Sequence, residues 1–346
     1  MEQLTDHPSI NHPSYFLQSS FLPGDEKLFF TSYRTGAPQL FEITIADRSL
    51  RQLTSGDPIH PFSAAYDEKR DEIVFTRGGS LWSVSPATRA ERLIAAIPGA
   101  QFGEPSLSPD GEWAAAAFKR GEEQGLAVAR MDGSGAHMIP FPRTIIHPQF
   151  HPLEPEWIEF AADPAPRMYR VRRDGSGLEC LYQHGNDEFV VHETFLGAAG
   201  DLVFTIWPHK LCVMDWTTRA IRTIADHNCW HIAPNRAGTE VLFDTNHPDR
   251  GIQIIDVATG AIRDVCRPEA SNGGSQWKTS RYAMPEDFEA ARSAAQKHLS
   301  WMEAGTDTVY GPQYTHPHPS WSRDERRIAF ASDRTGHPQV YIADVP

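Results

Sequence analysis

Two stretches near opposite ends of the chain share one outline: FLPGDEKLFFTSYRTGAPQLFEITIADRSLRQLT at residues 21–54 and SWSRDERRIAFASDRTGHPQVYIADV at residues 320–345. Each contains an apolar run, a turn with an Arg-Thr-Gly step, and a second apolar run. The outline recurs between them in stretches that begin at residues 72, 108, 156, 201 and 240. A period of about 40 residues is typical of repeated supersecondary units. The chain therefore holds seven such units.

Each unit is predicted to form four short strands, because apolar runs alternate with turns rich in Pro, Asp and Gly. Four-stranded units of this length, arranged radially, make a β-propeller. The last unit stops at YIADVP, residues 341–346, before a fourth strand, while EQLTDHPSI at residues 2–10 matches RQLTSGDPI at residues 51–59. The sequence therefore predicts an all-β, seven-bladed propeller that the N-terminal strand closes, and a single domain over residues 1–346.

One segment, about residues 271–312, breaks the repeat between units six and seven. Residues 285–302 begin with a proline and acidic residues, and they continue with Ala-rich helix formers and apolar spacing. This pattern predicts an inserted helix. The insertion is expected either to cap the central pocket or to be a surface excursion without a role.

Composition limits the partners. The 346 residues are 40% hydrophobic, and the net charge of −13 comes without a cluster of basic residues. Nucleic acids and anionic membranes require clustered Lys and Arg, so neither is an expected partner. The N-terminus lacks the pattern of a secretory signal, and no long apolar run is present, so we expect a cytoplasmic protein. The sequence does not fix the oligomeric state.

One position of each unit, four residues before the turn after the first strand, carries a polar side chain. From unit one to unit seven these residues are Gln18, His60, Glu104, His147, His192, His231 and His318. Five are histidine, although 16 histidines in 346 residues predict fewer than one in a sample of seven. The first strand of each blade lines the channel of a propeller, so these side chains are expected to converge at one mouth. For His60 and His147, binding of channel water is an alternative role.

A metal site is predicted where this series meets the segment GPQYTHPHPSW, residues 311–321. His231 and His318 fall on adjacent blades, and His316 is two residues before His318, on the same face of a strand. Gln313 can reach the same point from the preceding turn. Three imidazoles and one amide oxygen suit a divalent first-row metal with open positions, and the amide ligand favours Mn²⁺ over Zn²⁺.

Four segments resemble those of the oligogalacturonate lyases, which are seven-bladed enzymes of bacterial pectin breakdown. QYTHPHPSW at residues 313–321 is similar to the metal segment of that family. WHIAPNRAG at residues 230–238 resembles the stretch that carries its remaining metal histidine. The resemblance therefore implies the same ligands as the spacing does, His231, Gln313, His316 and His318.

The other two segments imply catalytic roles. HETF at residues 192–195 resembles the family stretch with the catalytic base, which would be His192. PRMYRV at residues 166–171 is similar to a strand whose arginine, here Arg167, binds the substrate. The chain departs from the family at FAADPAP, residues 160–166, just before that arginine. His192 as a fourth metal ligand, and Arg167 as part of a solvated arginine cluster, are the alternatives.

The chemistry implied is metal-dependent β-elimination. A metal ion and an arginine would stabilise charge on the carboxylate of a uronate while a histidine removes the C5 proton. The resemblance implies cleavage of short oligogalacturonides, such as digalacturonate, to 4-deoxy-5-keto-uronate. Two alternatives remain at this point: the same reaction on another uronate-containing oligosaccharide, and a non-catalytic propeller of the TolB or WD type that serves as an interaction platform.

Overall fold

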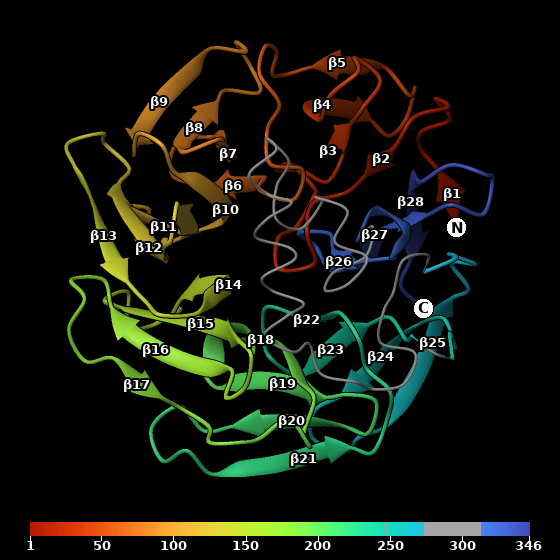
Figure 1. Cartoon of the computed structure of the whole chain (residues 1–346). Coiled ribbons are helices and arrows are strands. Elements are labelled where there is room, and N and C mark those ends of the chain that lie inside the picture. Colours follow the sequence, from red (N-terminus) through yellow and green to blue (C-terminus); the bar gives the residue numbers. More distant parts are fainter. Residues whose placement is uncertain (247, 273–312) are drawn as a thin grey trace.

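The computed structural model describes residues 1–246, 248–272 and 313–346. Within these ranges the chain forms seven four-stranded antiparallel sheets, arranged as blades around a central channel (Figure 1). The predicted seven-bladed propeller is confirmed. The helix predicted at residues 285–302, in the insertion of residues 271–312, lies outside the described residues.

The first four blades follow one another along the chain, each from its innermost to its outermost strand. Their strands are, for blade one, β2 (Asn11–His12), β3 (Lys27–Ser32), β4 (Gln39–Thr44) and β5 (Leu50–Gln52); for blade two, β6 (Ala65–Asp67), β7 (Glu72–Arg77), β8 (Ser80–Val84) and β9 (Glu91–Ala96); for blade three, β10 (Gln101–Leu107), β11 (Trp113–Arg120), β12 (Glu123–Arg130) and β13 (Ala136–Pro140); for blade four, β14 (Thr144–Phe150), β15 (Trp157–Asp163), β16 (Met168–Arg172) and β17 (Glu179–Cys180).

Blades five to seven continue the order, and two short 3₁₀ turns accompany them. Their elements are, for blade five, β18 (Val190–Phe195), η1 (Gly197–Ala199), β19 (Leu202–Ile206), β20 (Lys210–Met214) and β21 (Ile221–Ala225); for blade six, β22 (Ile232–Pro234), β23 (Glu240–Phe243), β24 (Ile252–Asp256) and β25 (Ile262–Cys266); for blade seven, η2 (Gln313–Thr315), β26 (Ser320–Trp321), β27 (Arg327–Ser332) and β28 (Gln339–Asp344).

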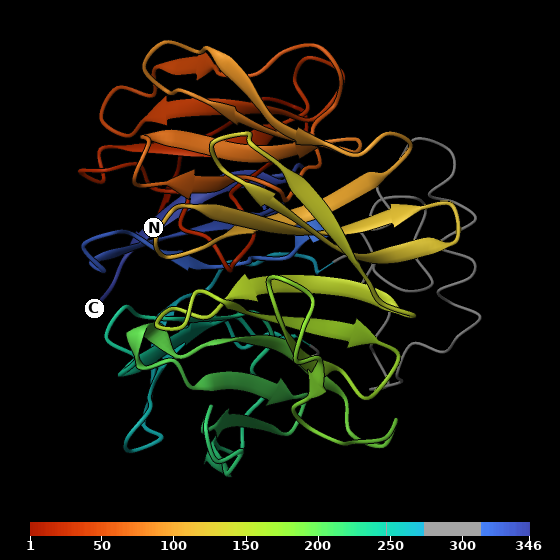
Figure 2. The same cartoon turned by 90° about the vertical axis from the view of Figure 1, so that its left-hand side faces the viewer.

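The N-terminal strand closes the ring. β1 (Glu2–Gln3) pairs antiparallel with β28, with Glu2 opposite Ile342 and Gln3 opposite Tyr341. Seen from the side, the two termini lie close together at one edge of the disc (Figure 2). The closure predicted from the repeated EQLT and RQLT stretches is thus confirmed, and it ties both ends of the chain into one sheet. None of the described residues forms a helix long and apolar enough to cross a membrane.

The core lies between adjacent blades. Leu28 and Phe30 of blade one, for example, pack in one buried cluster with Val340 and Ile342 of blade seven. Alternate residues of each strand face a neighbouring blade, so both faces of a sheet are apolar and buried. Each blade is therefore held by its two neighbours, which fixes the inner strands around the channel and positions the side chains that line it.

Candidate functional site

Histidines of four consecutive blades meet in the channel. The ring centroids of His147 and His192 lie 5.9 Å apart, those of His192 and His231 lie 4.6 Å apart, and those of His231 and His318 lie 3.9 Å apart. All four side chains are buried. The convergence predicted from the repeat is confirmed for blades four to seven.

Local backbone geometry turns these rings into the channel. The inner strand β14 shifts its register between Ile146 and Gln149, and β18 does so between Val191 and Thr194. His147 and His192 lie inside these irregularities with φ values of 53° and 56°, which are uncommon for residues other than glycine. His318 has a φ of 45°. The shared conformation re-aims each imidazole out of the strand ladder, which is how such irregularities serve functional sites.

Three of the predicted metal ligands form a compact cluster. One ring nitrogen from each of His231, His316 and His318 lies within 4.8 Å of the other two, and all three residues are buried. Nε2 of His231 and Nε2 of His318 are buried and have no hydrogen-bond partner in the described part of the chain. Buried polar atoms normally have a hydrogen-bond partner. Neighbouring imidazole nitrogens that lack one are therefore suited to coordinate a cation. Gln313 begins the turn η2, directly before His316 and His318, and its role as a ligand stays a prediction.

Asp244, which the sequence did not single out, anchors this cluster. Its Oδ2 accepts a hydrogen bond from Nδ1 of His231 at 2.8 Å, and its Oδ1 accepts one from the backbone N–H of His231 at 2.8 Å. The backbone N–H of His318 also donates to Oδ2, at 3.3 Å. A carboxylate on the far nitrogen fixes the tautomer of a histidine and directs Nε2 outward. The signal in the sequence was weak, since Asp244 only follows an apolar strand.

Burial and mutual repulsion keep the central imidazoles neutral. Burial lowers the pKa of His192, His231 and His318 well below the usual value, and the neighbouring histidines lower it further. A neutral imidazole can bind a metal ion or accept a proton, whereas an imidazolium can do neither. His192 also stands edge-on to Trp230 at 4.5 Å between ring centroids, and its Nδ1 has no hydrogen-bond partner among the described residues.

Arg167 lies immediately before β16, the third strand of blade four, and is 2% exposed. Its Nε donates to Oε1 of Glu193 at 3.0 Å, and its Nη1 pairs with the carboxylate of Asp163. Burial alone would raise the pKa of Glu193, but the charge of Arg167 and hydrogen bonds from His147 and Arg167 lower it below the usual value. Arg167 is therefore part of a buried ion-pair network and not of a solvated arginine cluster.

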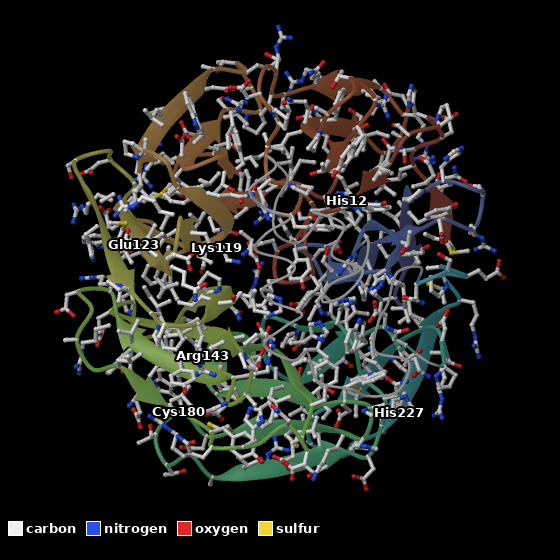
Figure 3. The ribbon with its side chains drawn as sticks, in the orientation of Figure 1. His12, Lys119, Glu123, Arg143, Cys180 and His227 are labelled. Carbon is white, nitrogen blue, oxygen red and sulfur yellow. The ribbon has the colours of Figure 1, made fainter. Side chains whose placement is uncertain are left out.

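The first blade departs from the predicted pattern. Gln18 does not join the histidines, because β2 ends at His12 and the ladder resumes only where the N–H of Phe29 bonds the carbonyl of Ser20. Residues 13–19 leave the sheet as a loop. The loop starts directly after His12, which lies at the inner part of its blade. Cys180, on the outermost strand of blade four, lies near the rim for comparison (Figure 3). The placement of Gln18 in the series was wrong, because the alignment passed over this loop.

The loop brings two aromatic residues into the channel instead. The hydroxyl of Tyr15 lies 2.9 Å from Nε2 of His147, and the ring of Phe16 lies 5.3 Å from that of His192 and 5.2 Å from that of His231. Both aromatic side chains are buried. Neither residue was predicted to line the channel, although an aromatic pair at the expected position of an inner strand is a usable signal.

His60 and Glu104 complete the inner surface of blades two and three. Both are buried, and Oε1 of Glu104 accepts a long hydrogen bond, 3.4 Å, from the backbone N–H of His147. Burial lowers the pKa of His60. Neither residue is part of the three-histidine cluster.

Comparisons with known proteins extend the likeness to the whole chain. No family model matches the sequence. An oligogalacturonide lyase from Pectobacterium atrosepticum is 21% identical over 390 residues, which cover 99% of this chain and 92% of the relative. An oligogalacturonate lyase from Dickeya dadantii is 22% identical over 381 residues, with the same coverage. The solved structure of an oligogalacturonate lyase in complex with manganese superposes with a TM-score of 0.81 at 20% identity, over 99% of this chain and 92% of that one.

These relatives are enzymes, so the interpretation as a non-catalytic interaction platform is not retained. The matches run through every blade, including the blades that carry QYTHPHPSW and HETF. The resemblance to the oligogalacturonate lyases is thus confirmed over almost the full length of the chain.

Proposed function

We propose that this protein is a metal-dependent lyase that cleaves short oligogalacturonides, digalacturonate and its unsaturated form, by β-elimination to 4-deoxy-5-keto-uronate. The observation that carries the proposal is the buried cluster of His231, His316 and His318 with His192 at its side. The names and the full-length similarity of the lyase relatives support it.

The metal would be held by His231, His316 and His318, with Gln313 as the fourth ligand. The proposed ion is Mn²⁺, in keeping with the mixed nitrogen and oxygen donors and with the manganese in the related structure. A divalent cation at this point supplies positive charge to the substrate carboxylate, where negative charge develops as the C5 proton leaves.

His192 is the proposed general base. Its ring is neutral at the pH of the cell because burial lowers its pKa, and it has an open Nδ1 that can accept the C5 proton. Proton transfer by a positioned side chain contributes roughly 10²–10⁴-fold to a rate. The rings of His231 and Phe16 and the indole of Trp230 hold the imidazole in place.

Arg167 is proposed to bind the carboxylate of the substrate. The two carboxylates of Glu193 and Asp163 exceed its single positive charge, so the network adds no positive charge to the pocket. Its contribution is then directional: a guanidinium fixed at two carboxylates can offer a further N–H in a defined orientation. The metal ion would therefore supply the net electrostatic attraction for a uronate.

The decisive test is the reaction of digalacturonate in water enriched in ¹⁸O. Elimination breaks the C4–O bond without water, so the new reducing-end uronate and the unsaturated product should carry no label from bond cleavage. Mass spectrometry of products quenched early, before ring opening and exchange, reports the label. Labelled, saturated galacturonate alone would show hydrolysis and contradict the proposal.

A second candidate is the same reaction on another uronate-containing oligosaccharide. The position of residues 160–166 favours this candidate, because this is the segment whose sequence differs from that of the oligogalacturonate lyases. This segment forms the end of β15 and the turn before Arg167, and its Asp163 pairs with that arginine. A panel of galacturonate, glucuronate and rhamnose-containing oligosaccharides distinguishes the two. Cleavage of another uronide with digalacturonate left intact would select the second candidate.

A further inference from the structure

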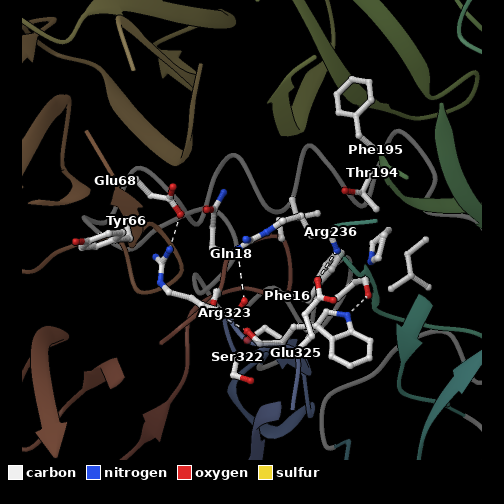
Figure 4. A pocket seen from close by; sticks show the side chains of 17 residues that line it. Phe16, Gln18, Tyr66, Glu68, Thr194, Phe195, Arg236, Ser322, Arg323 and Glu325 are labelled. Carbon is white, nitrogen blue, oxygen red and sulfur yellow. Dashed lines mark hydrogen bonds and ion pairs between the residues drawn. The ribbon is translucent and has the colours of Figure 1, made fainter. Parts of the chain in front are cut away.

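A pocket opens at the end of the channel away from the histidine cluster. It measures about 330 Å³ and lies among the loop of residues 16–19, the end of β18 and the turns that follow β6, β22 and β26 (Figure 4). The clustered histidines precede β22 and β26, whereas the pocket residue Pro234 ends β22 and the pocket residue Ser322 follows β26. Because the inner strands run along the channel, the pocket and the histidine cluster occupy opposite mouths.

Phe16 separates the two sites. Its ring packs against His231 at 5.2 Å and His192 at 5.3 Å, and the same residue lines the pocket. A ligand in the pocket therefore meets the far side of Phe16 and not the imidazole nitrogens. The pocket is a site distinct from the proposed metal centre.

Two arginines reach into this pocket with different partners. The guanidinium of Arg323 pairs with Glu68 and lies over the ring of Tyr66, 4.6 Å from its centroid. The Nη2 of Arg236 has only a long hydrogen bond, 3.4 Å, to the carbonyl of Arg323. No carboxylate pairs with the Arg236 guanidinium within the described ranges. Figure 4 shows its side chain extending across the pocket toward Gln18.

The surroundings of Arg236 restrict the ligand. Oε1 of Glu325 accepts a hydrogen bond from the backbone N–H of Arg236 at 2.6 Å, which places a carboxylate at the backbone of this residue, on the wall of the pocket. This carboxylate repels a second anionic group but accepts hydrogen bonds from hydroxyls. The amide of Gln18 offers a donor and an acceptor, and Phe195 and Trp321 add apolar surface. One carboxylate and several hydroxyls on a compact ring match this combination.

We propose that the pocket binds a monosaccharide-sized sugar acid, with its carboxylate on Arg236 and its hydroxyls on Glu325 and Gln18. The volume lies at the lower end of the range of small-molecule sites, roughly 300–1,000 Å³, as suits one sugar ring. A charge-assisted pair with a guanidinium supplies the specificity for an acid over a neutral sugar. The site goes beyond the proposed elimination, because none of the side chains that would contact the sugar acid, those of Arg236, Glu325 and Gln18, is assigned a part in that reaction.

The test is calorimetric titration of the full chain with D-galacturonate and, separately, with D-galactose. Galacturonate should bind saturably and galactose should not. Arg236→Gln should weaken the affinity for galacturonate at least about tenfold, because it removes a charge-assisted partner. Arg326→Gln is the matched control: this exposed arginine lies on the same turn as Glu325, outside the pocket, and its loss should leave the affinity unchanged.

Binding at the histidine cluster must be told apart from binding at this pocket. His231→Ala should leave the affinity for galacturonate within about twofold, since Phe16 separates the sites. Absence of saturable binding, equal binding of galactose, loss in His231→Ala, or an unchanged affinity in Arg236→Gln would each overturn the proposal. Equilibrium binding needs no turnover, so the outcome is independent of whether the elimination assay succeeds.

Discussion

Two buried clusters line the same channel, and they differ in whether their buried polar atoms have partners. In the first, His231 and His318 point ring nitrogens at a common space without hydrogen-bond partners in the described chain. In the second, Arg167 is bound by two carboxylates, those of Glu193 and Asp163. A buried donor or acceptor without a partner costs about 1–3 kcal/mol, so the first cluster carries a deficit that a ligand would remove. The second cluster is complete in itself.

The difference predicts opposite consequences of mutation. Truncating His318 removes a buried Nε2 that has no partner, so the fold should tolerate the loss, whereas truncating His231 also removes a hydrogen-bond partner of the buried Asp244 carboxylate. Truncating one partner of a buried ion-pair network leaves the other charges uncompensated, which costs about 3–5 kcal/mol of stability. Substitutions in the histidine cluster should therefore lower the metal content and the reaction rate. Substitutions in the arginine cluster should lower the reaction rate and the stability together.

The largest effect is expected for His231→Ala and His318→Ala. Each should lose the bound metal and reduce kcat/KM at least about 10³-fold, because a catalytic cation contributes several kcal/mol to transition-state stabilisation. Elemental analysis of protein purified without chelator, paired with the digalacturonate assay, checks both values. The matched control is His137→Ala, an exposed histidine on the outer strand β13, which should keep metal and rate. Undiminished metal in both channel variants would remove the cluster from consideration as the metal site.

His192→Ala should separate the base from the ligands. A general base acts on the transition state, so the variant should keep its metal and its affinity for substrate while kcat falls by about 10²–10⁴-fold. Metal analysis and steady-state kinetics on one preparation give the answer. If the metal disappears as well, or if added Mn²⁺ restores the rate, His192 is a fourth ligand, and the base must be sought at another channel imidazole, His147 first.

Arg167→Ala probes the complete cluster. Loss of the substrate partner should lower kcat/KM by about 10²–10³-fold, the range for removing one positioned donor in an active site. The buried carboxylates of Glu193 and Asp163 would lose their counter-charge, so thermal unfolding should also shift downward. Arg167→Lys is the control that keeps a charge: it should recover part of the stability but little of the rate, because an ammonium lacks the planar fork. Full activity in Arg167→Ala would leave the arginine with a purely structural role.

The fold could be predicted from the sequence because the repeat constrains it many times over. Seven copies of one strand pattern reveal the blade, and the partial copies at Glu2–Gln3 and in the last unit reveal the closure. Gln18 was misplaced because counting from a turn assumes strands of equal length, and blade one inserts a loop instead. Repeats thus predict topology well and local insertions poorly.

The proposed site was predictable where its residues share a position in the repeat. His192, His231 and His318 occupy equivalent places on neighbouring blades, so the fold alone brings them together. Asp244 escaped notice because it begins a different part of its blade, after β23, and reaches His231 only through hairpin pairing across β22 and β23. Residues that act through another side chain leave no pattern of their own in the sequence.

Asp244→Asn should give the smallest effect and test how far the open cluster depends on its anchor. The amide keeps a hydrogen-bond acceptor but not the negative charge, and it presents donors toward the N–H groups of His231 and His318 when it turns. Loss of such a partner lowers metal affinity by about 10–100-fold, so activity should fall at limiting Mn²⁺ and recover in excess. Titration of the metal-free enzyme with Mn²⁺ measures the shift, and circular dichroism verifies the fold. An unchanged affinity would mean that packing against neighbouring rings, and not the Asp244 hydrogen bond, orients His231.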